Sequence, residues 1–238
     1  MRHLLTCLFL AASLQAIPAL DHARQARELL GSETWSRVLK IENSARHSVY
    51  PENTYALAFE FNDMLWLYTS YDGTQSLSLY HGRVDSEKAD MGPLLKAVAP
   101  GFDRFVVVPD SEAPTPAGFS PEQLPNGCFV RSLAALRQKM GREWVRHAAL
   151  LCYYYGPRGR QGHTVLTYQD SAGLWVWDPD FPEAPTLQDN ELASDARRLA
   201  QSVHSTASVA RARFVPIRLE AFVSGAAAAS AGESGAAT

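Results

Sequence analysis

Proline is concentrated in the middle of this chain, and its position divides the sequence into two parts. Five of the 14 prolines fall within residues 109–125: Pro109, Pro114, Pro116, Pro121 and Pro125. Because proline lacks a backbone N–H and fixes φ, such a stretch resists the interiors of both helices and sheets. We therefore expect a connector over 109–125, a folded region over 20–108 before it and a second over 126–222 after it.

Length and charge are those of an ordinary globular protein. The chain has 238 residues, 46% of them hydrophobic, and a formal net charge of −3. It offers no strongly positive surface to a phosphate backbone, so we expect no nucleic-acid partner. No apolar run reaches the eighteen or so residues of a membrane span, so we expect no span in the mature chain. The oligomeric state stays open.

The N-terminus has the layout of a secretory signal peptide. Arg2 and His3 precede an apolar run over 4–12, which gives way to small residues and Pro18. This order of basic, apolar and small-residue segments predicts a signal peptide over 1–19, with cleavage after Ala16 or Ala19. We therefore expect a secreted or periplasmic protein. A buried N-terminal helix is the alternative interpretation.

The region over 20–108 is predicted to combine helix with a β meander. Residues 20–40 have a helical pattern, whereas 55–61 and 64–68 are rich in strand formers around an Asn62-Asp63 turn. A second turn at 71–73 leads to a third strand containing Leu77 and Leu79. A short helix over 86–98 and a strand over 104–108 complete this region.

The region over 126–222 is predicted to begin with an amphipathic helix and to continue as strands. Apolar residues Phe129, Leu133, Leu136 and Met140 recur at helical spacing, and Gly141 suits the end of that helix. Strands are predicted over 144–155, 163–168, 174–177 and 213–219, and a helix over 190–202. The Gly, Ala and Ser-rich tail over 223–238 is predicted to be disordered. The fold class is therefore α+β.

Three short motifs in this second region suit nucleophilic thiol chemistry. Cys128 follows Pro125-Asn126-Gly127 at the start of the predicted helix, His163 follows Gly162 at the start of a strand, and Asp178 precedes Pro179. A thiolate is needed for attack on a carbonyl, and both a helix N-terminus and a neighbouring imidazole favour it. We therefore predict Cys128 as nucleophile, His163 as base and Asp178 as the residue that orients the histidine.

The turn between the last two of these strands decides how His163 and Asp178 meet. A two-residue turn at Asp170 and Ser171 would place His163 directly opposite Asp178, and a four-residue turn over 170–173 would place Asp178 opposite Val165. Both registers put the His163 and Asp178 side chains on one face of the sheet.

Other residues near these motifs have predicted supporting roles. The backbone amide of Cys128 is the natural first oxyanion donor, and Gln123 or Asn126 is a candidate for the second. Arg158 and Arg160, in the glycine-rich loop over 156–162, are candidates for contact with an acidic substrate or simply solvated charges. The histidines and cysteines show no metal-ligand spacing, so we expect neither a metal nor another cofactor.

Over about 124–185 the chain resembles the papain-like superfamily, in particular bacterial transglutaminase-like cysteine peptidases and the related domains that process secretion leaders. Members share a cysteine at a helix start, a Gly-His opening a strand and an aspartate closing the next strand, which Cys128, His163 and Asp178 match. The resemblance implies a Cys-His-Asp triad that acts on amide bonds of a peptide or protein, in a core where the cysteine-bearing helix packs on an antiparallel sheet.

Several alternatives remain open at this point. A cysteine peptidase or amidase would release the thioester intermediate with water, whereas a transglutaminase or acyltransferase would release it with an amine. A secreted binding module would keep the papain-like shell without catalysis. A disulfide or redox pair between Cys128 and Cys152 would consume the predicted nucleophile.

Overall fold

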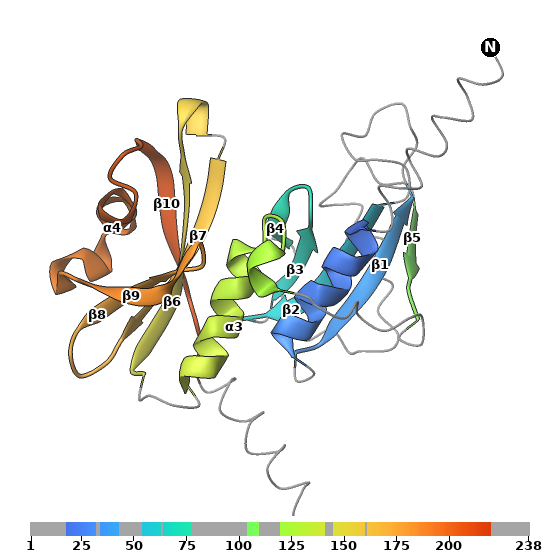
Figure 1. The fold of residues 1–238 in the computed structure, drawn as a ribbon, viewed down its shortest axis with the longest axis horizontal. Coiled ribbons are helices and arrows are strands. Elements are labelled where there is room, and N and C mark those ends of the chain that lie inside the picture. Colours follow the sequence, from blue (N-terminus) through green and yellow to red (C-terminus); the bar gives the residue numbers. More distant parts are fainter. Residues whose placement is uncertain are drawn as a thin grey trace, which may run out of the picture. The chain divides into compact units, whose positions relative to one another are not determined.

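The computed structural model describes eight parts of the chain: residues 18–31, 34–42, 54–62, 64–77, 104–109, 120–140, 145–159 and 161–219. The chain divides into two compact units between Gly127 and Cys128, two residues beyond the predicted connector. Each unit contains one five-stranded antiparallel sheet, so the α+β class is confirmed (Figure 1). Most of the predicted signal peptide, the helix over 86–98, Gly141, most of the proline-rich segment and the tail over 223–238 lie outside the described residues.

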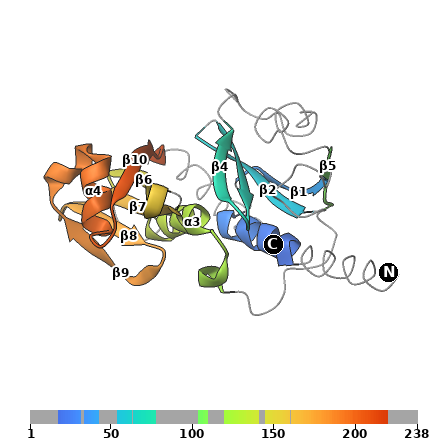
Figure 2. The same ribbon diagram turned by 90° about the horizontal axis from the view of Figure 1, so that it is seen from above.

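The first unit begins with a helix over 18–30 that covers one face of its sheet (Figures 1 and 2). Its buried residues are Ala19, Ala23, Ala26 and Leu30, at the spacing of one helix face. The expectation that this helix continues to residue 40 is wrong. Gly31, with φ 76°, ends it by donating its N–H to the Arg27 carbonyl, as glycine does after many helices.

The sheet of the first unit has the strand order β4-β3-β2-β1-β5. Its strands are β1 (Ser36–Glu42), β2 (Thr54–Phe61), β3 (Met64–Thr69), β4 (Gly73–Leu77) and β5 (Arg104–Val107). The predicted meander is confirmed, because β2, β3 and β4 are consecutive neighbours. Strand β1 was not predicted, since its residues were assigned to the helix before it.

The second unit contains the three predicted thiol-chemistry residues. Its elements are α3 (Cys128–Met140), β6 (His147–Tyr155), 3-10 helix η2 (Pro157–Gly159), β7 (Gln161–Gln169), β8 (Leu174–Asp178), β9 (Phe181–Gln188), 3-10 helix η3 (Asn190–Ser194), α4 (Ala196–Val203) and β10 (Val209–Pro216). The strand order is β10-β6-β7-β8-β9. Helices α3 and α4 lie on opposite faces of this sheet (Figures 1 and 2).

Apolar side chains and one buried hydroxyl hold α3 and α4 on the sheet. Leu199 and Ala200 of α4 are fully buried in a cluster with Leu151 and Val165 of the strands. Helix α3 packs mainly on β7, as predicted for the cysteine-bearing helix. Ser132 of α3 is fully buried, and its hydroxyl donates to the Thr164 carbonyl of β7 at 3.3 Å. This bond ties the helix that begins at Cys128 to the strand that carries His163.

Several predicted boundaries in this unit are corrected. Strand β6 begins at His147 and β7 at Gln161, while β10 covers 209–216 rather than 213–219. The single helix predicted over 190–202 is two helices, η3 and α4, because Asp195 between them is extended and caps α4.

Strand β9 was not predicted at all. It contains Pro182 and Pro185, which argue against a central strand. The prolines are tolerated because, among the residues that the structure describes, β9 is an edge strand that pairs only with β8.

Among the described residues, no helix is both long and apolar enough to span a membrane.

Candidate active site

Cys128 is the first residue of α3, as predicted, and its side chain is half-buried. Cys128 and Cys152 are both free thiols in the structure, so the disulfide between them is not formed. The first amides of a helix have no intrahelical acceptor and form the positive end of its dipole. This position therefore favours a negative charge on the sulfur.

The hairpin of β7 and β8 brings His163 and Asp178 together. The Asp170 carboxylate accepts N–H bonds from Ala172 and Gly173 and so organises a four-residue turn. The resulting register pairs Leu166 with Trp177, which is the second of the two predicted registers.

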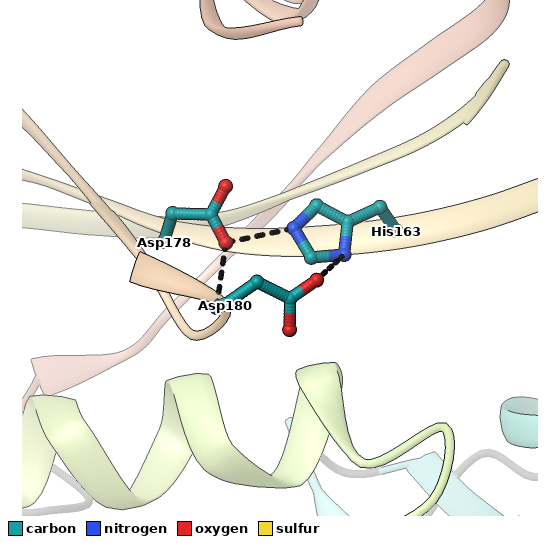
Figure 3. A group of neighbouring side chains, drawn as sticks. All are labelled: His163, Asp178 and Asp180. Atoms are coloured by element: carbon teal, nitrogen blue, oxygen red, sulfur yellow. Dashed lines mark hydrogen bonds and ion pairs between the residues drawn. The ribbon is translucent and has the colours of Figure 1, made fainter. Parts of the chain in front are cut away.

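The predicted contact between His163 and Asp178 is formed. Nε2 of His163 lies 2.9 Å from Oδ1 of Asp178 (Figure 3). The Asp178 oxygen also accepts the backbone N–H of Asp180 at 2.9 Å. Because two donors hold the carboxylate, its orientation toward the ring is fixed.

His163 carries a strongly shifted pKa. Its side chain is 9% exposed, and burial alone would lower the pKa. Hydrogen bonds from the ring to the Asp178 and Cys128 side chains, together with the charges of both groups, outweigh burial and raise the pKa to about 10. The imidazole is therefore protonated at neutral pH and interacts with both proposed partners.

Asp178 is shifted in the complementary direction. Burial raises the pKa of its carboxyl group, but the hydrogen bond and charge of His163, the Asp180 amide and the charge of Arg131 together lower it below the ordinary value. Asp178 is thus an anion at neutral pH. It fixes the ring through Nε2 and stabilises the imidazolium.

Two further charged residues of the site were missed by the sequence interpretation. Asp180 lies on the other side of the ring, with Oδ2 3.8 Å from Nδ1 of His163 (Figure 3). Its Oδ1 accepts a bond of 3.3 Å from Nη1 of Arg131, a residue of α3. Asp180 lies two residues after Asp178, just beyond the Asp178-Pro179 motif.

Tyr153 is a third residue that lies beside the His163 ring. It pairs with His163 across β6 and β7, and the two rings meet edge to face with their centroids 5.5 Å apart. The side chain is fully buried, and its hydroxyl has no hydrogen-bond partner among the described residues. Burial and then the Asp178 carboxylate raise the pKa of Tyr153 well above its usual range, so it stays neutral.

Cys152 has a different environment from Cys128. Burial raises the pKa of its thiol to about 11, and the Thr164 hydroxyl donates to its sulfur at 3.6 Å. Cys152 is therefore a protonated thiol at neutral pH, and it serves as an internal reference for the reactivity of Cys128.

The predicted oxyanion donors Gln123 and Asn126 belong to the first unit. Gln123 is exposed at the end of a 3-10 helix, η1 (Pro121–Gln123). The side-chain amide of Asn126 donates to the backbone carbonyls of Ser70 and Tyr71, at 2.8 and 3.1 Å. Its side-chain amide is thus engaged in holding the turn, and an oxyanion role for Gln123 or Asn126 stays a prediction.

Of the two predicted loop arginines, the structure describes one. Arg158 is exposed in η2 and has a left-handed backbone, with φ 65°. Arg160 lies outside the described residues. A substrate contact by either residue stays a prediction.

His163, Asp178 and Asp180 are close enough together to be considered as metal ligands, since their ligand atoms all lie within 4.8 Å of one another. The two carboxylates, however, face different nitrogens of one ring (Figure 3). The Asp178 oxygen nearest the ring is already hydrogen-bonded to the ring and to the Asp180 amide, and Asp180 is paired with Arg131. The geometry fits a hydrogen-bonded imidazolium better than a metal centre.

Comparison with known proteins gives no match: no protein-family model, no curated protein and no solved structure is similar to this chain. Function is therefore argued from the geometry of the site.

Proposed function

We propose that this protein is a cysteine-dependent amide hydrolase, a peptidase or amidase, with Cys128, His163 and Asp178 as its catalytic triad. The observation that carries the proposal is the His163 ring, hydrogen-bonded through Nε2 to Asp178 at 2.9 Å, with its pKa raised first by Asp178 and also by the Cys128 side chain. The resemblance of residues 124–185 to papain-like cysteine peptidases supports the same assignment. Its substrate class is a peptide or protein.

Each triad residue has a defined role in this reaction. The Cys128 thiolate attacks the amide carbonyl carbon, and the developing oxyanion accepts the backbone N–H of Cys128. The His163 imidazolium then gives its proton to the leaving nitrogen as the C–N bond breaks, which leaves a thioester on Cys128. With His163 as base, water then gives it a proton and attacks the thioester; the C–S bond breaks, the acid product leaves, and the Cys128 thiolate and His163 imidazolium are restored. Asp178 keeps the ring oriented and stabilises its charged form.

We propose that the protein acts outside the cytoplasm, as the signal-peptide pattern over 1–19 indicates. Within the described residues, the helix over 18–30 already includes Pro18 and the buried Ala19. Cleavage after Ala16 would keep this helix whole, whereas cleavage after Ala19 would remove its first residues. We therefore favour Ala16, which N-terminal sequencing of the mature protein would test.

Alkylation of the folded, reduced protein tests the proposed nucleophile. We expect iodoacetamide at about pH 5 to label Cys128 at least roughly tenfold faster than Cys152, because only an ion-paired thiolate persists at that pH. Peptide mapping by mass spectrometry assigns each label to its cysteine. The Cys128→Ala variant should lose the fast phase. Equal, slow labelling of both cysteines would contradict the proposal and would favour a binding module without catalysis.

Product analysis separates hydrolysis from acyl transfer. Incubation with a casein digest should give new carboxyl termini in the wild type and none in Cys128→Ala. If the products instead incorporate added methylamine in preference to water, the same site is that of a transglutaminase or acyltransferase and the hydrolase assignment is wrong.

A further inference from the structure

Asp180 is a second carboxylate beside the catalytic histidine, and the proposed triad gives it no role. It contacts the two elements that carry the other reacting groups: His163 of β7 through Oδ2 and Arg131 of α3 through Oδ1. Its side chain is 58% exposed, whereas those of Arg131 and His163 are 10% and 9% exposed. The carboxylate therefore lies at the solvent side of the site, between the nucleophile's helix and the base.

The significance of Asp180 lies in which nitrogen of the His163 ring it approaches. Asp178 occupies Nε2, so Nδ1 is the nitrogen left to interact with the Cys128 sulfur. Asp180 approaches the same nitrogen, at 3.8 Å. In the proposed triad, this N–H therefore has two acceptors, the Cys128 thiolate and the Asp180 carboxylate, and these two anions repel each other.

Arg131 lies three residues after Cys128 and therefore on the same side of α3. Its guanidinium binds the Asp180 oxygen that does not face the ring. This ion pair neutralises part of the carboxylate charge and holds the carboxylate from its other side.

We propose that Asp180 is a positioning residue that competes with the Cys128 thiolate for the Nδ1 side of His163, and that Arg131 limits this competition by binding the carboxylate. The inference rests on the proposed function. On this proposal, the Asp180–Arg131 ion pair modulates how strongly the His163 N–H attracts the Cys128 thiolate. Removal of the Asp180 charge should make the thiolate form at lower pH, and removal of Arg131 should make it form at higher pH.

Other charged or titratable groups act on this cluster from neighbouring strands. They are Asp178 of β8, Tyr153 and Cys152 of β6, and Arg213 of β10, which acts on Cys152. None of these side chains is altered by substitution at 180 or 131, so their contribution is common to all variants.

The pH dependence of Cys128 alkylation by iodoacetamide, measured in the full chain, tests the inference. We expect the acid midpoint to fall by about 0.5–1 pH unit in Asp180→Asn and to rise by a similar amount in Arg131→Met, given partial solvent screening. Glu183→Gln, which removes a negative charge from an exposed position of β9, is the matched control and should leave the midpoint unchanged. In an Asp180→Asn background, Arg131→Met should shift the midpoint less than it does in the wild type.

The outcomes separate this inference from the proposed function. A wild-type Cys128 that reacts quickly, with the same midpoint in Asp180→Asn, would overturn the competition and leave the triad intact. Slow wild-type labelling at all acid pH values would refute the triad itself. A fall in Arg131→Met in place of a rise would also overturn the inference. Because this second variant shifts the midpoint in the opposite direction, it tests the competition even if Asp180→Asn does not fold.

Discussion

The imidazole of His163 is bound on both sides, and the partner on each nitrogen has its own consequence. Asp178 at Nε2 provides both orientation and charge, since the oxygen that faces the ring is also fixed by the Asp180 amide. Burial of the ring would by itself favour the neutral form. The carboxylate is therefore the main reason why the buried ring is charged.

Replacement of Asp178 by asparagine tests this role directly. Asparagine keeps the size of the side chain and loses its charge. We therefore expect the pKa of His163 to fall from about 10 by about one unit or more. The measurement is the NMR titration of the His163 ring C–H resonance. We also expect at least about a hundredfold loss of amide hydrolysis, because the ring loses the partner that orients it.

The NMR resonance is assigned by its disappearance in His163→Gln. An Asp178→Asn protein in which this resonance titrates as it does in the wild type would show that the carboxylate does not stabilise the imidazolium.

Local motifs singled out the three residues of the proposed triad but not the charges around them. Cys128, His163 and Asp178 each occupy a recognisable place: a helix start, a Gly-His and an Asp-Pro. Arg131, by contrast, reads as an ordinary polar position of an amphipathic helix, and Asp180 reads as a turn residue. Their ion pair joins residues 49 positions apart, so it depends on how α3 packs and not on any local pattern.

At the scale of elements, α4 depends on a cap at its N-terminus. The Asp195 carboxylate accepts the backbone N–H groups of Arg197 and Arg198, at 3.1 and 3.0 Å. The helix has only eight residues, so most of its stability comes from packing and from this cap.

Loss of the cap should weaken the second unit. We expect Asp195→Ala to lower the free energy of unfolding by about 1 kcal/mol, as measured by urea denaturation, because two helix amides lose their acceptor. Asp195→Asn, which retains a capping oxygen, is the matched control and should stay within about 0.5 kcal/mol of the wild type. Equal losses in the two variants would show that the carboxylate acts through its charge and not as a cap.

Turn chemistry explains which elements were predictable. The four-residue turn at 170–173 was one of two options, and Asp170 selects it by accepting two backbone amides and the Trp175 indole N–H. Strand β1 was not predicted because the amphipathic pattern continues past Gly31, where the helix ends. Strand β9 was not predicted because its two prolines argue against a strand. Its position at the edge of the sheet, which is a property of the fold, permits them.

For the whole molecule, the shifted pKa values of His163 and Asp178 couple stability to pH. The folded pKa of His163, about 10, exceeds the unfolded value of about 6.5. Its contribution to stability is thus complete below the unfolded pKa and is lost as pH rises through about 10. The folded pKa of Asp178 is depressed, so its contribution is present above the unfolded value of about 3.9 and is lost as pH falls through the folded pKa.

We therefore expect the free energy of unfolding to decline between about pH 7 and pH 10, by on the order of a few kcal/mol. Urea denaturation at a series of pH values measures it. The decline should be much smaller in His163→Gln, which cannot bind the proton. If this variant shows the full wild-type decline, alkaline destabilisation comes from other groups.

The division into two units follows from the proline run, because prolines interrupt both kinds of regular hydrogen bonding. The sequence placed the division between 125 and 126, two residues before that of the structure. Helix and strand boundaries within each unit were less accurate, since they depend on the caps at Gly31 and Asp195 described above.

The edge strand β9 has a consequence for self-association. Phe181 and Leu187 expose 75% and 55% of their surfaces on it, which would otherwise invite another chain to stack alongside and begin an aggregate. Pro182 and Pro185 have no amide hydrogen, so β9 has fewer donors with which an incoming strand could pair. Pro182 and Pro185, which argued against a strand in the sequence, thus protect the sheet bearing His163 from fibril-like growth.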